Sequence, residues 1–364
     1  MPAKAVKPIE TKGGLLSSYY RRGGDRLGRH RVIAPEGALP QAATRLDNSL
    51  PIFDNEILIN VSTLNIDSAS FRQMKEIAGG KADGVAKQVL ANVEKMGKQQ
   101  NPVTGSGGML LGTVEDMGPG YSNPCKVKRG DKICTLVSLT LTPLIIEKIK
   151  DVRDSEQIDI DGKAVLFDSG VLAKIPADMD LNVCLALLDV AGAPPQADRL
   201  ARKGDTIYII GAGKSAILCA AAIREKLGKD CTIIASATRE ESVETFKALD
   251  LVDECFVANA LKPAETMDKV AKITEGRMCD LCINTANVEG TELSSVLACK
   301  QGGRVYFFNM ATNFQKAALG AEGVGMDVEM IIGNGYAPDH AEFTLNVYRK
   351  NPAVRKWFDG KFSV

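Results

Sequence analysis

The chain has 364 residues, with 45 basic and 45 acidic side chains and a formal net charge of zero. This balance argues against a nucleic-acid or polyanion partner, and the length predicts two domains. Residues 1–14 contain no apolar run of signal-peptide length, and the longest apolar stretch, 216–223, is too short to span a bilayer. We therefore expect a cytoplasmic protein that binds neither nucleic acid nor membrane.

The nine cysteines show no framework of regular spacings. Cys279 and Cys282 form a CxxC, but they lie in the strand-like run CDLCINTA, where residues three apart are expected to face opposite sides. The only histidines are His30 and His340, and a second CxxC is missing. Zinc needs three or four ligands, so the sequence predicts buried thiols in a reducing compartment and no bound metal.

The first half of the chain predicts a small antiparallel β-domain, which we place at 1–182. After an irregular arm of about 30 residues, short β-prone runs alternate with Gly- and Pro-rich segments. These runs lie at 31–33, 56–64, 109–114, 131–139 and 164–168. A helical stretch at 70–98, interrupted at 79–80, is expected to form an insertion in this domain.

The second half predicts a different architecture. Residues 177–202 indicate helices broken at Pro194 and Pro195, and regular alternation follows. The expected strands lie at 206–211, 231–236, 254–259, 280–286, 304–309 and 328–333, and the first four intervening helices at 214–227, 240–249, 263–274 and 290–299. Short strands without polar alternation indicate a parallel sheet covered on both faces, so we expect an α/β doubly wound Rossmann domain at 183–338. A helical C-terminal segment, 339–364, follows it.

The first turn of this domain has the pattern GxGxxA. Gly211 permits a tight turn, Gly213 lets the backbone approach a diphosphate, and the small Ala216 lets the helix pack closely on the strand. Lys214 and Ser215 open the helix, whose free N–H groups and positive dipole end favour phosphate. The turn therefore predicts a nicotinamide dinucleotide site.

Further cofactor contacts are expected at the carboxyl ends of other strands, where ligands bind in open α/β sheets. The residues there are Ser236, Arg239, Asn284, Thr285, Ala286 and Asn309. Ala237 or Thr238 occupies the place of the acidic residue that binds the ribose of NAD, so the choice between NAD and NADP stays open. An ATP-binding P-loop is disfavoured, because Tyr208 stands where that motif needs glycine.

The order of the parts, the run GxVxxxGxG at 112–120 and the Gly-Asp pair at 130–131 resemble the medium-chain dehydrogenase/reductase superfamily. The resemblance implies a GroES-like catalytic domain before the Rossmann domain. It also places the zinc ligands of other members near Asp67, Gly108, Met109 and Asp189, so the metal-binding set is absent and two carboxylates replace two thiolates. By the same analogy, strand 328–333 is a candidate contact in a homodimer.

Several longer strings are similar to one zinc-free branch, the L-erythro-3,5-diaminohexanoate dehydrogenase family of lysine fermentation. The strings are HRVIAPEGALPQ, LDNS, NEILINVSTLNIDSASF and NPVTGSGGMLLGTVE. The resemblance implies NAD-dependent oxidative deamination of a small diamino acid, with release of ammonia.

Such a substrate carries two ammonium groups and one carboxylate. Asp67 and Asp189 are our candidates for binding the ammonium groups and for accepting a proton, and Arg29, His30 or Arg31 for binding the carboxylate. The alternatives are structural, with Asp67 as a helix cap and Asp189 as a boundary charge.

Two other functions are compatible with the pattern. A zinc-free enone or quinone reductase using NADPH would need an apolar pocket, which two carboxylates disfavour. A dinucleotide-binding regulator would bind the cofactor without turnover.

Overall fold

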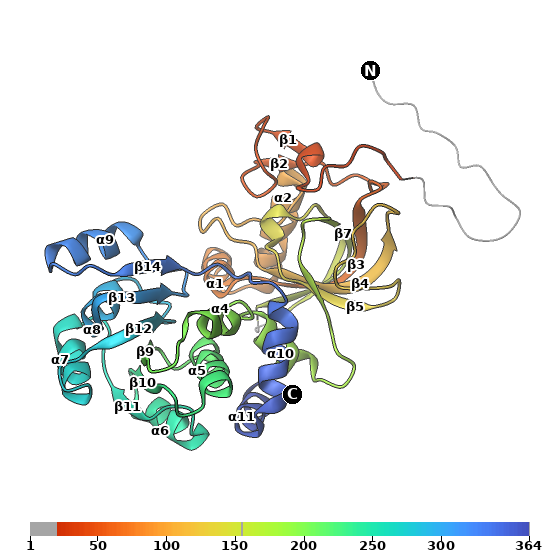
Figure 1. Cartoon of the computed structure of the whole chain (residues 1–364). Coiled ribbons are helices and arrows are strands. Elements are labelled where there is room, and N and C mark those ends of the chain that lie inside the picture. The colour runs from red at the N-terminus through yellow and green to blue at the C-terminus, as the bar shows by residue number, and fades with distance from the viewer. Residues whose placement is uncertain (1–19, 154–155, 364) are drawn as a thin grey trace, which may run out of the picture. The chain divides into compact units, whose positions relative to one another are not determined.

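A computed structural model describes residues 20–153 and 156–363 of the chain, which divides into two compact units, Met1–Lys174 and Ile175–Val364 (Figure 1). The sequence placed this boundary eight residues later, after 182. Most of the expected N-terminal arm, including residues 1–14, lies outside the described residues. Each unit is described by itself.

The first unit is built on an antiparallel sheet with strand order β6-β7-β3-β4-β5-β8. Its strands are β3 (Glu56–Asn65), β4 (Met109–Met117), β5 (Lys132–Thr135), β6 (Leu144–Val152), β7 (Gln157–Phe167) and β8 (Leu172–Lys174). A separate short pair, β1 (Val32–Ala34) and β2 (Arg45–Leu46), follows the 3-10 turn η1 (Arg29–Arg31), and a second such turn, η2 (Leu139–Leu141), precedes β6. The expected β-rich domain is confirmed.

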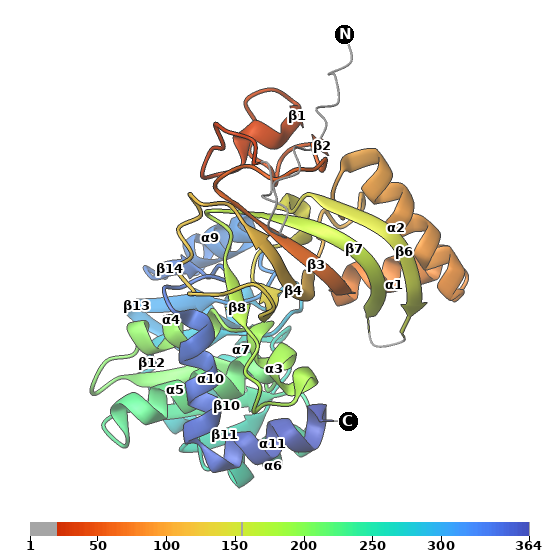
Figure 2. The same ribbon diagram turned by 90° about the vertical axis from the view of Figure 1, so that its right-hand side faces the viewer.

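The helical insertion lies between β3 and β4, as expected, and consists of α1 (Ser68–Ile77) and α2 (Ala82–Met96) (Figure 2). Gly79 and Gly80 separate the two helices with φ angles of +59° and +79°, which favour glycine. Three valines spaced four residues apart on α2 are buried in the core of the sheet, and their spacing explains why this segment folds as a helix.

Strand β6 was missed, and β7 begins seven residues before its predicted start. Strand β6 contains four charged residues without a strict alternation of apolar and polar side chains. Strand β7 contains two aspartates and Gly162, residue types that are depleted in strands. The glycine has a packing reason, because a Cβ there would lie 2.4 Å from the carbonyl oxygen of Ile145 on β6.

The second unit is a parallel sheet with strand order β11-β10-β9-β12-β13-β14, which is the doubly wound order of a Rossmann domain. Its strands are β9 (Thr206–Ile210), β10 (Thr232–Ala237), β11 (Glu254–Val257), β12 (Cys279–Asn284), β13 (Cys299–Phe307) and β14 (Glu329–Ile332). The predicted α/β class is therefore confirmed, and the carboxyl ends of β9 and β12 meet side by side.

Helices connect and flank these strands. They are α3 (Leu181–Leu188), α4 (Ala193–Leu200), α5 (Lys214–Leu227), α6 (Glu240–Leu249), α7 (Pro263–Ile273), α8 (Glu292–Ala298), α9 (Phe314–Gly323), α10 (His340–Lys350) and α11 (Pro352–Phe362). The predicted break at Pro194 and Pro195 was misplaced, since both prolines lie in the first turn of α4, where a missing N–H does no harm. Helix α10 packs on α3, α4 and α5, and α11 on α3 and α5.

The prediction that Cys279 and Cys282 face opposite sides of their strand was wrong. The ladder with β13 is irregular beside Cys279, because two steps along β12, from Cys279 to Leu281, stand against five along β13, from Cys299 to Arg304. Both thiols belong to the same buried cluster. Burial raises the pKa of the Cys282 thiol, which is also hydrogen-bonded to Cys279 and Cys299. In the described parts of the chain, no helix is both long and apolar enough to cross a membrane.

Candidate dinucleotide site and acidic residues

The turn after β9 has the geometry of a diphosphate cradle. Gly211 has a φ angle of +110°, and a Cβ on it would lie 2.6 Å from Thr285 Oγ1, so other residues are excluded. Gly213 precedes α5 and is exposed, and a Cβ on it would meet no heavy atom within 4 Å. The space in front of Gly213 is thus open to a ligand, as a diphosphate site requires.

Helix α5 presents its free amino end to this space. The N–H of Ile217 bonds the carbonyl of Gly213, so the N–H groups of the three preceding residues lack an intrahelical partner. Lys214 and Ser215 are half-buried, while Ala216 is fully buried and lets α5 lie close to the sheet. The residues present fit a dinucleotide diphosphate.

Ser236, near the end of β10, is hydrogen-bonded to the glycine turn and to the interior of the domain. Its hydroxyl lies 2.6 Å from the Tyr208 hydroxyl in the interior, and its carbonyl accepts a hydrogen bond from the Gly211 N–H. Burial raises the pKa of Tyr208, so this phenol stays protonated. Thr238 and Arg239, by contrast, are exposed beyond the strand.

The predicted contacts after β12 and β13 are held by hydrogen bonds to the neighbouring loops and to the glycine turn. Asn284 is buried and donates to Thr291 and Ser295, and its side-chain oxygen accepts from the Ala286 N–H. Thr285 donates from both its N–H and its hydroxyl to the carbonyl of Ile210, tying this loop to the glycine turn.

Asn309 extends the same framework. Its amide donates to the Asn284 carbonyl at 3.3 Å, and its oxygen accepts from the Ala311 N–H and the Thr312 hydroxyl. Thus Asn284 and Asn309 shape the loops at the sheet edge, and Thr285 and Ala286 are the half-buried residues of this group that stand beside Gly211.

An open depression of about 540 Å³ lies at these loops. Its lining residues are Glu289, Met310, Ala311, Thr312, Asn313, Phe314 and Gln315. The sequence analysis missed all of them, although their place directly after β12 and β13 was the available signal. Glu289 is bonded to Lys316 at 2.5 Å, and this bond lowers the pKa of the Glu289 carboxyl.

Asp67 occupies the cap position before α1 in the first unit, but its carboxylate makes no cap hydrogen bond. Only its backbone carbonyl serves the helix, by accepting from the Phe71 N–H. The side chain is exposed at the end of β3. The interpretation of this carboxylate as a helix cap is therefore not supported by the geometry.

Asp189, at the end of α3 in the second unit, is engaged in an ion pair. Its Oδ2 accepts from Lys214 Nζ at 2.6 Å, and the two side chains are 47% and 28% exposed. Sequence reasoning had named both residues but missed their contact, because nothing in a separation of 25 residues indicates it. Among the residues that the structure describes, no group of three or more His, Cys, Asp or Glu could hold a metal ion.

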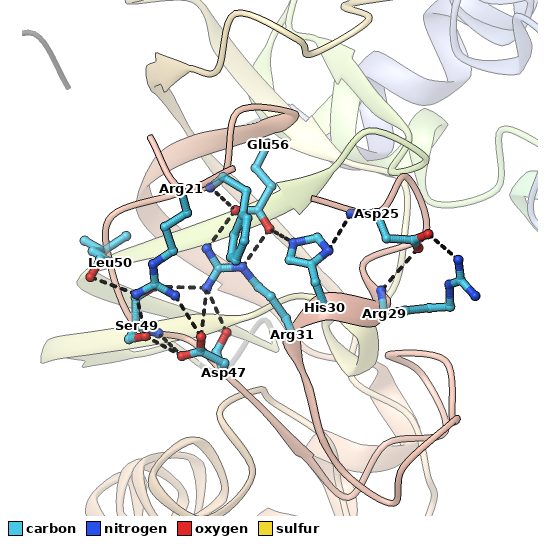
Figure 3. A network of polar contacts seen from close by, with 10 residues as sticks. Arg21, Asp25, Arg29, His30, Arg31, Asp47, Ser49, Leu50 and Glu56 are labelled. Carbon is cyan, nitrogen blue, oxygen red and sulfur yellow. Dashed lines mark hydrogen bonds and ion pairs between the residues drawn. The ribbon is translucent and has the colours of Figure 1, made fainter. Parts of the chain in front are cut away.

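Arg31 lies in a buried polar network of the first unit (Figure 3). Its Nε and Nη2 donate to the two carboxylate oxygens of Glu56 at 2.6 and 2.7 Å, and its Nη1 donates to the carbonyls of Asp47 and Ser49. The Arg31 side chain is 0% exposed. This arginine therefore holds η1 to β3 and is not placed to bind a substrate carboxylate.

His30 and Arg29 belong to the same network. His30 Nδ1 accepts from the Asp25 N–H, which assigns the ring proton to Nε2, and Nε2 donates to Glu56 at 2.8 Å. Burial alone would raise the pKa of Glu56, but the hydrogen bonds from Arg31 and His30 outweigh it and the pKa is lowered. Arg29 is exposed and is bonded to Asp25 at 2.6 Å, so it is the most accessible of the three basic residues.

The comparisons with known proteins agree with this architecture. Residues 30–176 match the model of the L-erythro-3,5-diaminohexanoate dehydrogenase N-terminal domain. An L-erythro-3,5-diaminohexanoate dehydrogenase of Acetoanaerobium sticklandii is 48% identical over 92% of this chain and 98% of its own, and one of Fusobacterium nucleatum is 45% identical with the same coverage.

Among solved structures, an alcohol dehydrogenase of Thermotoga maritima has a TM-score of 0.52, with 84% of this chain and 85% of that chain covered. An alcohol dehydrogenase of Thermus sp. ATN1 has a TM-score of 0.51, with 86% and 88% covered. At 15% and 16% identity these likenesses show the fold alone. The two closely similar sequences, which match over nearly their whole length, show more: the chain belongs to the L-erythro-3,5-diaminohexanoate dehydrogenase family.

Proposed function

We propose that the chain oxidatively deaminates L-erythro-3,5-diaminohexanoate at its 3-amino group, giving 5-amino-3-oxohexanoate, ammonia and a reduced nicotinamide dinucleotide. Membership of the family supports the substrate. The observation that carries the chemistry is the open cradle at Gly211 and Gly213, together with the accessible carboxylate of Asp67. The alternatives of an enone reductase and of a non-catalytic regulator are not favoured by the family.

Asp67 is the proposed base. The 3-ammonium group must lose a proton before its nitrogen can supply a lone pair, and an exposed carboxylate without a cap hydrogen bond is suited to accept it. A bound dinucleotide would then take the hydride from carbon 3. Water adds to the resulting iminium carbon, and the carbon–nitrogen bond breaks to release the nitrogen as an ammonium ion and leave the ketone. The sum of the steps consumes one water and releases one proton.

The carboxylate of the substrate needs a cation. Of the three basic residues predicted for this role, Arg29 has the exposed guanidinium, whereas Arg31 is buried against Glu56. We therefore propose Arg29, bonded to Asp25 in the structure, as the candidate that exchanges partners with a substrate carboxylate.

For the cofactor we propose NAD, with NADP also accepted. The exposed residues after β10 are Thr238 and Arg239, so the acidic residue that would repel a 2′-phosphate is missing there. We also propose a homodimer formed through β14, and a cytoplasmic location, in agreement with the free, buried thiols of Cys184, Cys219 and Cys231.

The direct test measures the absorbance of reduced nicotinamide when the purified protein is mixed with 3,5-diaminohexanoate and either dinucleotide. Reduced cofactor and ammonia should form in equal amounts. Absence of both products with NAD and with NADP would remove the assignment. An enone or quinone substrate with NADPH serves as the comparison that tests the reductase alternative.

A further inference from the structure

We propose that Asp189 is a positioning residue, which through its ion pair with Lys214 sets how tightly the glycine turn holds the dinucleotide. The inference deepens the proposed function and rests on it in one respect, that a dinucleotide binds at this turn. It also divides the work of the two carboxylates, because it assigns the proton transfer to Asp67 alone.

The pair lies at the cofactor helix. Lys214 is the first residue of α5 and directly follows Gly213, and its Nζ donates to Asp189 Oδ2 at 2.6 Å. The same Nζ lies 5.9 Å from the centre of the Phe362 ring at the end of α11. Helix α11 packs on both α3 and α5. Asp189 after α3 and Phe362 on α11 therefore approach the ammonium group from two neighbouring elements, whose ribbons Figure 2 shows.

The charges at this place oppose one another. The amino end of α5 and the Lys214 ammonium both attract a diphosphate. Asp189 neutralises that ammonium and fixes its direction, so an arriving diphosphate must compete with a carboxylate for the same cation. Asp189 is therefore expected to weaken dinucleotide binding and to ease the release of the reduced cofactor, a step that limits turnover in many dehydrogenases.

The two carboxylates also differ in availability. Asp189 already accepts a hydrogen bond from an ammonium group, whereas the Asp67 carboxylate makes no bond to the helix that it precedes. A group that must collect a proton from an incoming ammonium is better placed when no cation occupies it.

The test titrates NADH into the protein and follows nicotinamide fluorescence, so it requires no turnover. We expect Asp189→Asn to lower the Kd for NADH about two- to fivefold at low salt, a factor typical of a partly exposed ion pair, and the gain to shrink at high salt. Lys214→Met should raise the Kd. In the double variant, Asp189→Asn should have no further effect, because its partner is gone.

A matched control removes one negative charge near the opposite end of α5. Glu225 on α5 pairs with Lys350 at 2.6 Å, about 16 Å along the helix from Lys214 at 1.5 Å per residue. Glu225→Gln should leave the Kd for NADH unchanged. A decrease equal to that of Asp189→Asn would show a bulk charge effect and overturn the proposal.

Two other results would also overturn it. One is an equal tightening by Asp189→Asn in the presence and absence of Lys214. The other is an unchanged Kd with loss of the acidic limb of the pH profile of kcat/KM, which would make Asp189 the base. If the unaltered chain does not bind NADH, the proposed function itself fails. That result differs from the two above, in which the unaltered chain binds NADH and only the role of Asp189 is overturned.

Discussion

At the scale of single residues, two aspartates in equivalent positions use their carboxylates differently. Asp180 precedes α3 and its Oδ1 accepts from the N–H groups of Asn182 and Val183, at 2.9 and 3.1 Å. Asp67 precedes α1 and its side chain caps nothing. Both residues stand at the N-cap position of a helix with nearly the same backbone angles, so only the side-chain contacts in the structure separate the capping aspartate from the one whose carboxylate does not cap.

Asp67→Asn should therefore reduce kcat by on the order of 10²–10⁴-fold, the range for loss of a general base, and leave the unfolding free energy nearly unchanged. Steady-state kinetics and denaturant unfolding measure the two effects. Asp180→Ala should show the reverse pattern, with a stability loss of about 1 kcal/mol and little change in kcat. Retained kcat in Asp67→Asn would leave the reaction without its proposed base.

Glu56 offers a second residue-scale prediction. Glu56→Gln leaves the Arg31 guanidinium buried without a counter-charge, which should cost about 3–5 kcal/mol of unfolding free energy. The folded-state pKa of Glu56 is lowered, so its contribution is complete above the pKa of an unfolded glutamate and is lost as the pH falls through the folded value.

The difference in stability between Glu56→Gln and the unaltered chain should thus shrink on the acid side, which urea unfolding across a pH series measures. Glu56→Asp keeps the charge and serves if the first variant does not fold. The exposed pair of Arg29 and Asp25 provides the control, and Arg29→Ala should have little effect on stability at any pH. A pH-independent difference would contradict this assignment of the charge.

At the scale of elements, the turn after β9 contains two glycines, and glycine is useful at each position for a different reason. Gly211 is required by the protein itself, since a Cβ would meet Thr285 and the φ angle is positive. Gly213 has a φ of −86° and open space around its Cβ position, so the fold does not need it. Its absence of a side chain is useful only to a ligand that approaches the backbone.

Gly213→Ala should therefore keep the melting temperature and raise the Kd for NADH by about tenfold or more, since a methyl group would enter the ligand's space. Gly211→Ala should lower both the melting temperature and the affinity. Thermal unfolding and NADH titration separate the two variants. Gly204→Ala, which changes a positive-φ turn elsewhere in the unit with no heavy atom within 4 Å, measures the cost of backbone strain alone.

The sequence predicted those helices and strands whose own residues determine their conformation. The bounds of α5 were predicted to the residue, because a glycine turn precedes it and an apolar run fills it. Strand β6 was missed because its ladder with β7, and not its own composition, makes it a strand. The same holds for the predicted site. The role of Gly211 follows from the spacing of the glycine motif. The ion pairs of Arg31 with Glu56 and of Asp189 with Lys214 each join residues 25 positions apart, and no spacing rule predicts such pairs.

At the scale of the whole molecule, the outer edge of the Rossmann sheet is open in the described structure. Strand β14 ends the sheet, with β13 on one side. Exposed apolar side chains occur in this strand and in the preceding helix α9, including Ile332 at 66%, Phe314 at 66% and Leu319 at 68%. An unpaired edge with apolar neighbours favours pairing with a second copy.

Ile332→Lys should convert the proposed dimer to a monomer, because a charged side chain on an edge strand opposes edge-to-edge pairing. Light scattering after size-exclusion chromatography measures the mass. Leu90→Lys, which changes an exposed leucine on α2 of the other unit, is the control and should leave the mass unchanged. A monomeric unaltered chain would remove the proposal.

The buried ion pair of Arg31 and Glu56 bears on how relatives of this chain are recognised. The string HRVIAPEGALPQ contains Arg31. The shorter string NEILINV, which is the first part of the longer string that includes Asp67, contains Glu56, so both strings carry one residue of a buried structural pair. A homologue could retain both strings while its residue at the place of Asp67 has changed. A search for relatives by these strings should therefore check position 67 as well, because the buried pair and the residue at position 67 are separate features of the sequence.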